Sequence, residues 1–256
     1  MIDIHSHILP NIDDGSSSKE MTLEMLRQAV EDGTKSIVAT PHFCRGYGES
    51  TYAEVKDLVK DIKKLAKDEG IEINIYHGQE VYYSESMLED YNEGIIGTIN
   101  DSKYMLFELP MTMEPDENVF NIIYELQLKG VVLILAHPER YKFVINNPGK
   151  INRFIEEGIL FQVNSGSLMG KFGDKVQKTA NILLENGIYN FIGSDAHNDT
   201  SRKTGISEAA ILASKKNKIY EELFYESAER VLKNQDVEFF GEKVRKKKLL
   251  FSFFNR

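Results

Sequence analysis

Seven short runs of β-branched and aromatic residues alternate with amphipathic segments along almost the whole chain. The expected strands cover residues 2–5, 36–40, 71–76, 103–109, 131–136, 159–163 and 188–193. Between them apolar residues recur at helical spacing, as at Val55, Val59 and Ile62. This alternation predicts the α/β class, with a parallel sheet covered by helices. An open doubly wound sheet and a closed barrel both fit it, and 256 residues are enough for either as one domain.

Side chains that bind metal ions stand at the C-terminal ends of most of the expected strands. In chain order they are His5, His7, His42, His77, Glu80, Glu108, His137, Asp195 and His197. In β/α barrels this end of the strands holds the active site. A closed barrel gathers all of these ends around one rim, whereas an open sheet would spread them along an edge. The distribution of ligands therefore favours the barrel.

The first strand contains His-x-His, and on an extended strand alternate side chains point to the same face. His5 and His7 can therefore bind one ion from one side. Imidazole and carboxylate ligands without thiolates suit manganese, iron or zinc. The number of ligands exceeds what one ion can use, which predicts two or three ions. Clustered ions suit phosphoester hydrolysis, because they activate water and neutralise phosphate oxygens.

A phosphate also requires fixed positive donors. Arg140 follows His137, and Arg202 follows His197, so both arginines are expected on loops at the same rim. A guanidinium group can bind two phosphate oxygens at once. Arg45, close to His42, is a weaker third candidate. Asp13 and Asp14 precede Gly15 and are interpreted first as turn residues and second as catalytic ones.

Several classes of protein are excluded. The residue six positions after Cys44 is Ser50, so the cysteine–arginine spacing of cysteine-based phosphatases is missing. The sequence has no GxxxxGK[ST] loop and no strand followed by GxGxxG, which leaves nucleotide binding without support. The net charge of −9 argues against non-specific binding to nucleic acid. One cysteine and an N-terminus unlike a signal peptide predict a cytoplasmic protein.

Seven segments together resemble one bacterial family. They are MIDIHSHILPNIDDG, ATPH, GQE, FELP, AHPERY, QVNSGSL and SDAHN, in this order over nearly the whole chain. They are similar to the capsule-type protein-tyrosine phosphatases of the CpsB/CapC/YwqE group, which belong to the PHP (polymerase and histidinol phosphatase) superfamily. The resemblance implies a distorted (β/α)7 TIM-like barrel with a site for three metal ions. It implies manganese as the usual metal, with iron, zinc or magnesium as alternatives. The implied substrate and partner is the phosphotyrosine-bearing tail of a bacterial tyrosine kinase that controls capsule or exopolysaccharide synthesis.

The resemblance also implies roles for single residues. The implied metal ligands are His5, His7, His42, Glu80, Glu108, His137, Asp195 and His197. Glu80 would bridge ions, and His42 would bind the third. Arg140 and Arg202 would hold the phosphate, and His42 or His197 could assist proton transfer. His77 has no place in the family pattern and is expected to be structural. Phe43 stands where relatives often have a basic residue or histidine.

The expected reaction is attack by a metal-bridging hydroxide on the phosphorus atom, without a phosphoenzyme. Three alternatives remain. The first is hydrolysis of histidinol phosphate or another small phosphomonoester by the same site. The second is an amidohydrolase, although carboxylates stand where that fold commonly has a lysine. The third is a non-catalytic, metal-stabilised scaffold.

The chain is expected to form one barrel domain over residues 1–242 and a basic, aromatic tail over residues 243–256. The tail carries six basic and no acidic residues. It is interpreted first as a solvated extension. Its alternative role is an attraction to the anionic inner face of the membrane. No run of 18 apolar residues that could span a membrane is found.

Overall fold

The computed structural model describes residues 1–245 of the chain. Within them the strands are β1 (Ile2–Ser6), β2 (Ser36–Ala39), β3 (His42–Phe43), β4 (Asn74–His77), β5 (Glu80–Tyr82), β6 (Tyr104–Glu108), β7 (Val132–Ala136), β8 (Leu160–Asn164) and β9 (Phe191–Gly193). The neighbouring strands pair in parallel, as the alternating sequence pattern predicted.

Two of the seven predicted strands, 36–40 and 71–76, are each followed after a kink by a second short strand that the sequence pattern did not predict. After β2 the chain passes Thr40 and Pro41 and continues as β3, and after β4 it passes Gly78 and Gln79 and continues as β5. Proline has no N–H group to donate to a strand ladder. A Cβ atom at Gly78 would lie 3.3 Å from the side chains of Thr40 and Val38. The two neighbouring strands therefore bend together, which divides the sheet into the orders β1-β2-β4 and β3-β5-β6-β7-β8-β9.

The barrel closes between its first and last strands. His7 N donates to Ala196 O over 2.8 Å, and Asp195 N donates to His5 O over 2.9 Å. The residue pair Ser6 and Ala196 forms a parallel bridge. The structure is thus a distorted (β/α)7 barrel, which decides between the closed barrel and the open sheet that the sequence pattern left open.

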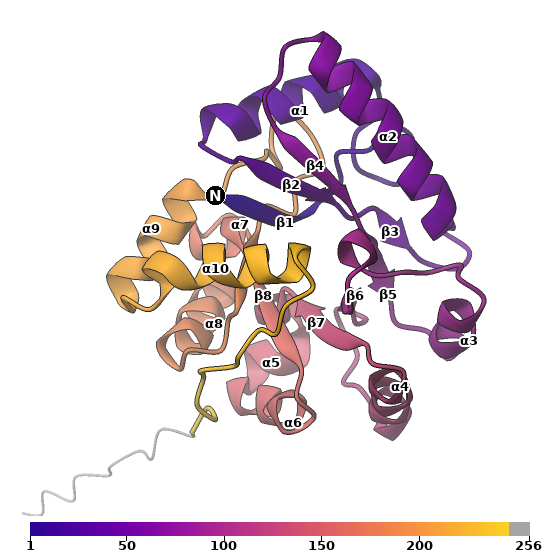
Figure 1. Cartoon of the computed structure of the whole chain (residues 1–256). Helices are drawn as coiled ribbons and strands as arrows, with labels where there is room; N and C mark the ends of the chain where they lie inside the picture. Colours follow the sequence, from indigo (N-terminus) through magenta and orange to yellow (C-terminus); the bar gives the residue numbers. More distant parts are fainter. Residues whose placement is uncertain (246–256) are drawn as a thin grey trace, which may run out of the picture.

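Helices surround the strands (Figure 1). In the described part of the chain they are α1 (Lys19–Glu31), α2 (Tyr52–Asp68), α3 (Met87–Asn92), α4 (Glu117–Leu128), α5 (Lys142–Asn146), α6 (Ile151–Glu156), α7 (Ser165–Leu168), α8 (Asp174–Glu185), α9 (Ser207–Lys216) and α10 (Tyr220–Leu232), with 3-10 turns η1 (Ile99–Asp101), η2 (Pro138–Arg140) and η3 (Pro148–Lys150). The longest, α2, begins with a capping box in which the Thr51 and Glu54 side chains bond to each other's backbone N–H.

Apolar side chains fill the barrel toward the N-terminal ends of its strands, and the side chains at the C-terminal ends are polar. Leu106, Leu160 and Phe191 belong to one buried cluster, which Ala228 and Val231 of α10 cover. Side chains two residues further along a strand point to the same side. Two residues after Leu106, the inward side chain at the C-terminal end of β6 is therefore Glu108. In β8 the inward side chains after Leu160 are Gln162 and Asn164. The strands thus position polar side chains directly above a dry core.

The described start of the predicted tail contacts the barrel. Val244 is buried, and its backbone N and O atoms bond to the side chain of Asn152 over 2.8 and 3.0 Å. Lys243 Nζ lies 2.6 Å from Glu156 Oε1. The rest of the predicted tail, residues 246–256, lies outside the described residues. Among residues 1–245, no helix has the length and apolarity needed to cross a membrane.

Candidate metal centre

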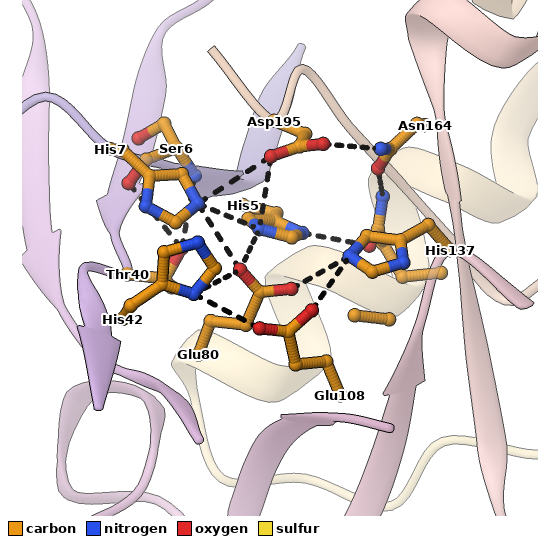
Figure 2. Close-up of polar contacts among 12 residues, drawn as sticks. His5, Ser6, His7, Thr40, His42, Glu80, Glu108, His137, Asn164 and Asp195 are labelled. Carbon is orange, nitrogen blue, oxygen red and sulfur yellow. Dashed lines mark hydrogen bonds and ion pairs between the residues drawn. The ribbon is translucent and has the colours of Figure 1, made fainter. Parts of the chain in front are cut away.

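Eight of the nine strand-end side chains converge at the C-terminal end of the barrel, and Figure 2 shows them apart from His197. Seven of these side chains, all but His137, join Asp14 in three sets whose nitrogen and carboxylate oxygen atoms lie within 4.8 Å of one another. The sets are His5, His7, Glu80 and Asp195; His42, Glu80 and Glu108; and His7, Asp14, His42 and His197. Glu80, His7 and His42 each belong to two sets, so the three sets are contiguous.

His5 and His7 face the same point, as the His-x-His spacing predicted. Their Nε2 atoms are 3.2 Å apart, and each lies 3.1–3.2 Å from Oε2 of Glu80. Both Nε2 atoms are also 3.5–3.6 Å from Oδ1 of Asp195. A Cβ atom at Gly193 would lie 2.6 Å from the Cβ of His5. Glycine is therefore required in β9 for His5 to occupy this position.

The opposite ring nitrogens are held by Gln162, which was not predicted as a site residue, and by Asp13, which was interpreted first as a turn residue. Nδ1 of His5 lies 2.9 Å from Oε1 of Gln162, and Nδ1 of His7 lies 2.7 Å from Oδ2 of Asp13. Such contacts fix the tautomer and orientation of a metal-binding imidazole. Gln162 lies in the QVNSGSL segment, and Asp13 lies in the loop after the His-x-His strand. In the sequence, the position of both residues close to the C-terminal end of a strand was the feature that could have assigned them to the site.

Glu80 connects the histidines of separate strands. Its Oε2 lies 3.2 Å from Nδ1 of His42, and its Oε1 lies 2.8 Å from Nε2 of His137. Glu108 Oε1 lies 3.1 Å from the same His42 nitrogen. His137 has the left-handed backbone angles φ 34° and ψ 55°. Strained backbone of this kind is concentrated at functional sites.

Asp14 is the ligand candidate that the sequence analysis ranked lower, as a turn residue. Its Oδ1 lies 3.4 Å from Nε2 of His197 and 3.6 Å from Nε2 of His42. It is half-exposed, whereas most of the other acids of the site are buried. Two acids in the loop after a His-x-His strand were a signal for the site, but a DDG sequence is equally typical of a turn.

The cluster fits metal ions on its own geometry. Oε2 of Glu80 is fully buried beside three imidazole nitrogens, yet no described group donates a well-directed hydrogen bond to it. A buried carboxylate oxygen without a donor is costly. A cation among these atoms would satisfy the oxygen and the two facing Nε2 atoms of His5 and His7. The donor set of imidazoles and carboxylates is typical of manganese, iron or zinc.

Charge inside the cluster keeps Glu80 and Asp195 ionised. Burial raises the pKa of Glu80, but the charges of His5 and His42 outweigh it and hold that pKa well below its usual value. Burial opposes ionisation of Asp195 too, and contacts with His7, His5 and Arg202 hold its pKa well below the usual value. Burial lowers the pKa of His7, but the Asp13 carboxylate more than compensates and raises it well above normal. Glu80 and Asp195 are therefore in the anionic form that metal binding requires.

Both predicted phosphate-binding arginines reach the cluster and meet at one atom. Arg140 Nη1 and Arg202 Nη2 lie 2.9 and 2.7 Å from Oδ2 of Asp195. Asn164 Nδ2 donates to the same oxygen over 2.6 Å. The Nε of Arg202 is buried and has no hydrogen-bond partner among the described residues. The Arg140 guanidinium also lies over the ring of Phe172, 4.7 Å from its centroid.

Three other side chains considered from the sequence lie outside the cluster. His77 Nε2 is 3.4 Å from Oδ2 of Asp101, and the His77 ring lies against that of Tyr52. Arg45 forms an ion pair with the buried Asp90, so it is committed elsewhere than to the metal ligands. Phe43 is buried in the hydrophobic core.

Comparison with known proteins identifies the family of this chain. The model of the family described as "Capsular polysaccharide synthesis, CpsB/CapC" matches residues 1–233. The chain belongs to the CpsB/CapC family. This confirms the resemblance and the enzyme class predicted from the motifs, because the named relatives are tyrosine phosphatases.

Two relatives and one solved structure illustrate the similarity. The chain is 35% identical over 257 residues to "Tyrosine-protein phosphatase YwqE" of Bacillus subtilis strain 168, covering 99% of this chain and 100% of that protein. It is 33% identical to "Putative tyrosine-protein phosphatase CapC" of Staphylococcus aureus, covering 96% and 94%. A chain from the crystal structures of YwqE from Bacillus subtilis and CpsB from Streptococcus pneumoniae, described as metal-dependent tyrosine phosphatases, matches with a TM-score of 0.90. The sequence identity is 34%, with 96% of this chain and 100% of that chain covered.

Proposed function

We propose that this member of the CpsB/CapC family is a metal-dependent protein-tyrosine phosphatase. The observation that carries the proposal is the junction at Asp195. One of its carboxylate oxygens faces the His5 and His7 nitrogens, and the other binds Arg140 and Arg202. Metal ligands and phosphate-binding donors therefore share one residue. A phosphate group bound to the ions would lie within reach of both guanidinium groups.

Three ions are proposed, with manganese as the metal and iron, zinc or magnesium as alternatives. One would be held by His5, His7, Glu80 and Asp195. A second would use Glu80, Glu108 and His137, and a third would use Asp14, His42 and His197. Bound ions lower the pKa of water to give a nucleophile and neutralise the phosphate oxygens.

The chain's own residues would bind and orient the substrate. Arg140 and Arg202 donate to phosphate oxygens, and Asn164 keeps the Asp195 carboxylate in place between them. Gln162 and Asp13 hold the His5 and His7 rings. Water attacks phosphorus in line, the P–O bond to tyrosine breaks, and no phosphoenzyme forms. His42 or His197 would assist transfer of the water proton to the departing tyrosine oxygen through a ring nitrogen that holds no ion, and His42 is the more exposed, at 17% against 5%.

The proposed substrate is phosphotyrosine on the tail of a bacterial tyrosine kinase that controls capsule or exopolysaccharide synthesis. The family description and the relatives' names support this assignment. Action on such a kinase would place the protein in the cytoplasm, at the inner face of the membrane. The basic residues of the segment 243–256 would favour that face electrostatically.

A substrate panel tests the proposal. Phosphate release is measured with a phosphotyrosine peptide, the same peptide carrying phosphoserine, and histidinol phosphate. The proposal predicts release chiefly from the phosphotyrosine peptide. Release chiefly from histidinol phosphate would retain the metal centre but reject the substrate. Metal binding without turnover of any of the three would favour the scaffold alternative.

A further inference from the structure

A cavity of about 220 Å³ adjoins the metal centre on the side of Asp195 and Arg202. Two loops at the C-terminal end of the barrel form it. One runs from α7 to α8 and supplies Lys171 and Phe172, and the other follows β9 and supplies Ser201, Arg202 and Lys203. Asp195 is common to this cavity and to the metal ligands. A substrate bound at the ions would therefore border the cavity.

The lining of this cavity is positively charged, although the chain as a whole has a net charge of −9. Lys171, Arg202 and Lys203 are its cations, and Asp195 is its one carboxylate among the described residues. Oδ2 of Asp195 already accepts from Arg140, Arg202 and Asn164. The ion pairs beside the cavity are those of Arg140 and Arg202 with Asp195, and neither Lys171 nor Lys203 has a carboxylate within 4.0 Å among residues 1–245. The two lysines are thus available to an external anion.

The wall of the cavity is connected to the phosphate-binding donors. Phe172 lines the cavity, and the Arg140 guanidinium lies over its ring at 4.7 Å. Neighbouring residues of an extended peptide are about 3.8 Å apart between Cα atoms. With the phosphotyrosine held at Arg140 and Arg202, a long side chain on the adjacent residue, one Cα spacing away, would extend beside the phosphotyrosine toward Phe172 and the two lysines.

The rim has the opposite charge on the side of β6. A cavity of about 180 Å³ there includes Leu109, which directly follows Glu108. Its charged lining residues among those described are Glu85, Glu114 and Asp116, all acidic; Lys150 pairs with Glu114, and Glu85 and Asp116 have no ion pair within residues 1–245. The charge of the rim therefore changes from positive to negative across the metal centre. Complementary charge orients a bound partner and rejects the reverse orientation.

We propose that the cavity between Lys171, Phe172 and Lys203 is a subsite for an acidic side chain next to the phosphotyrosine of the substrate. The proposal rests on the proposed phosphatase function and specifies its substrate class: phosphotyrosine peptides with a carboxylate on one flank. The lysines act in recognition of the peptide. The acidic cavity near Glu108 disfavours binding with that flank reversed.

Steady-state kinetics with matched peptides test this subsite. Four phosphotyrosine peptides carry glutamate or glutamine, on the N-terminal or the C-terminal side of the phosphotyrosine. The unmodified protein should prefer glutamate over glutamine on one side by about threefold to tenfold in kcat/KM, mainly through KM, as expected for two exposed ion pairs. The preference should shrink in high salt, because exposed charges are screened.

Variants then assign the preference to the lysines. Lys171→Ala combined with Lys203→Ala should reduce the ratio of the two kcat/KM values to about one. Lys64→Ala combined with Lys67→Ala, two exposed lysines on α2, is the matched control and should keep the ratio. Lys171→Glu combined with Lys203→Glu should instead favour a lysine-flanked peptide.

Equal rates for glutamate and glutamine peptides with the unmodified protein would overturn the subsite and leave the phosphatase function intact. The same holds if the alanine pair keeps the preference. Failure of the unmodified protein to hydrolyse any of the four peptides would overturn the proposed function, and the subsite with it.

Discussion

The carboxylate of Asp13 accepts a hydrogen bond from the imidazole of His7, with Oδ2 and Nδ1 2.7 Å apart. The same oxygen accepts from the backbone N of His42, and Oδ1 accepts from the backbone N of Gly15. One side chain thereby connects the loop after β1 to two histidines of the metal centre. It directs Nε2 of His7 toward Glu80 and Asp195.

Replacing Asp13 should therefore weaken metal binding although Asp13 is not among the proposed ligands. We expect Asp13→Ala to reduce metal affinity about 10-fold to 100-fold, the usual effect of removing a group that orients a ligand. Asp13→Asn retains one acceptor oxygen and should show a smaller loss. Metal titration of the stripped protein measures both. Unchanged affinity in Asp13→Ala would show that the His7 ring is held by other contacts.

Removing metal should destabilise the fold. The site gathers three buried acids, the half-exposed Asp14 and five imidazoles, which ions would neutralise and connect. A ligand present at 100 times its dissociation constant contributes about 2.7 kcal/mol per site. For a chain of this size that corresponds to a fall in Tm of about 5–10 °C per site when a chelator is added. Thermal unfolding with and without the chelator tests this, and equal Tm values would argue against resident ions.

Each of the two arginines should contribute strongly to turnover. We expect Arg140→Ala and Arg202→Ala each to lower kcat/KM about 100-fold, comparable to removing a donor from an oxyanion hole. A lysine at either position keeps the positive charge but cannot make the bidentate contact. Its kcat/KM should therefore lie between those of the alanine variant and the unmodified protein. Metal content, measured alongside, should stay near that of the unmodified protein. A parallel loss of metal would mean that the arginines act by holding Asp195.

Asp3 should make stability fall as pH rises. It is buried beneath His5, accepts from the backbone N atoms of His5 and Ser194, and burial raises its pKa to about 6. Because the folded chain retains the proton longer than the unfolded chain, its contribution is fully present below about pH 4 and lost by about pH 6. At pH 8 Asp3→Asn should be more stable than the unmodified, metal-free protein by about 2–3 kcal/mol.

Urea unfolding at pH 5 and pH 8 measures this difference directly. The difference in free energy of unfolding between Asp3→Asn and the unmodified protein should be smaller at pH 5, because Asp3 is then largely protonated in the folded protein. Comparing the two proteins at each pH cancels the titration of other groups. A gap that is the same at both values would contradict a raised pKa.

The barrel and most of the cluster could be predicted from the sequence, because parallel strands bring their C-terminal ends to one rim. His5, Glu108 and His137 occupy strand ends, where a short apolar run defines the position of the next polar residue. The kinks at Pro41 and Gly78 were not predicted, since they depend on how two neighbouring strands bend together.

Residues in loops were harder to assign. Asp14 reaches His197 across the rim through a loop whose path the local sequence does not determine. His77 ends β4 as a ligand would, but the chain turns at Gly78 and leaves it against Asp101. Arg45 is paired with Asp90, a contact 45 residues away in sequence that no periodicity indicates.

Phosphate release from a phosphotyrosine peptide by metal-stripped protein, before and after manganese is restored, tests the central claim most directly. Glu108→Ala, which removes a carboxylate of the cluster and is expected to keep the fold, is measured in parallel with circular dichroism as the control for folding. The account predicts no release without metal, release after manganese is added, and a loss of at least about 100-fold in Glu108→Ala. Equal release by the stripped protein, or near-normal rates in a folded Glu108→Ala variant, would contradict the metal-dependent mechanism.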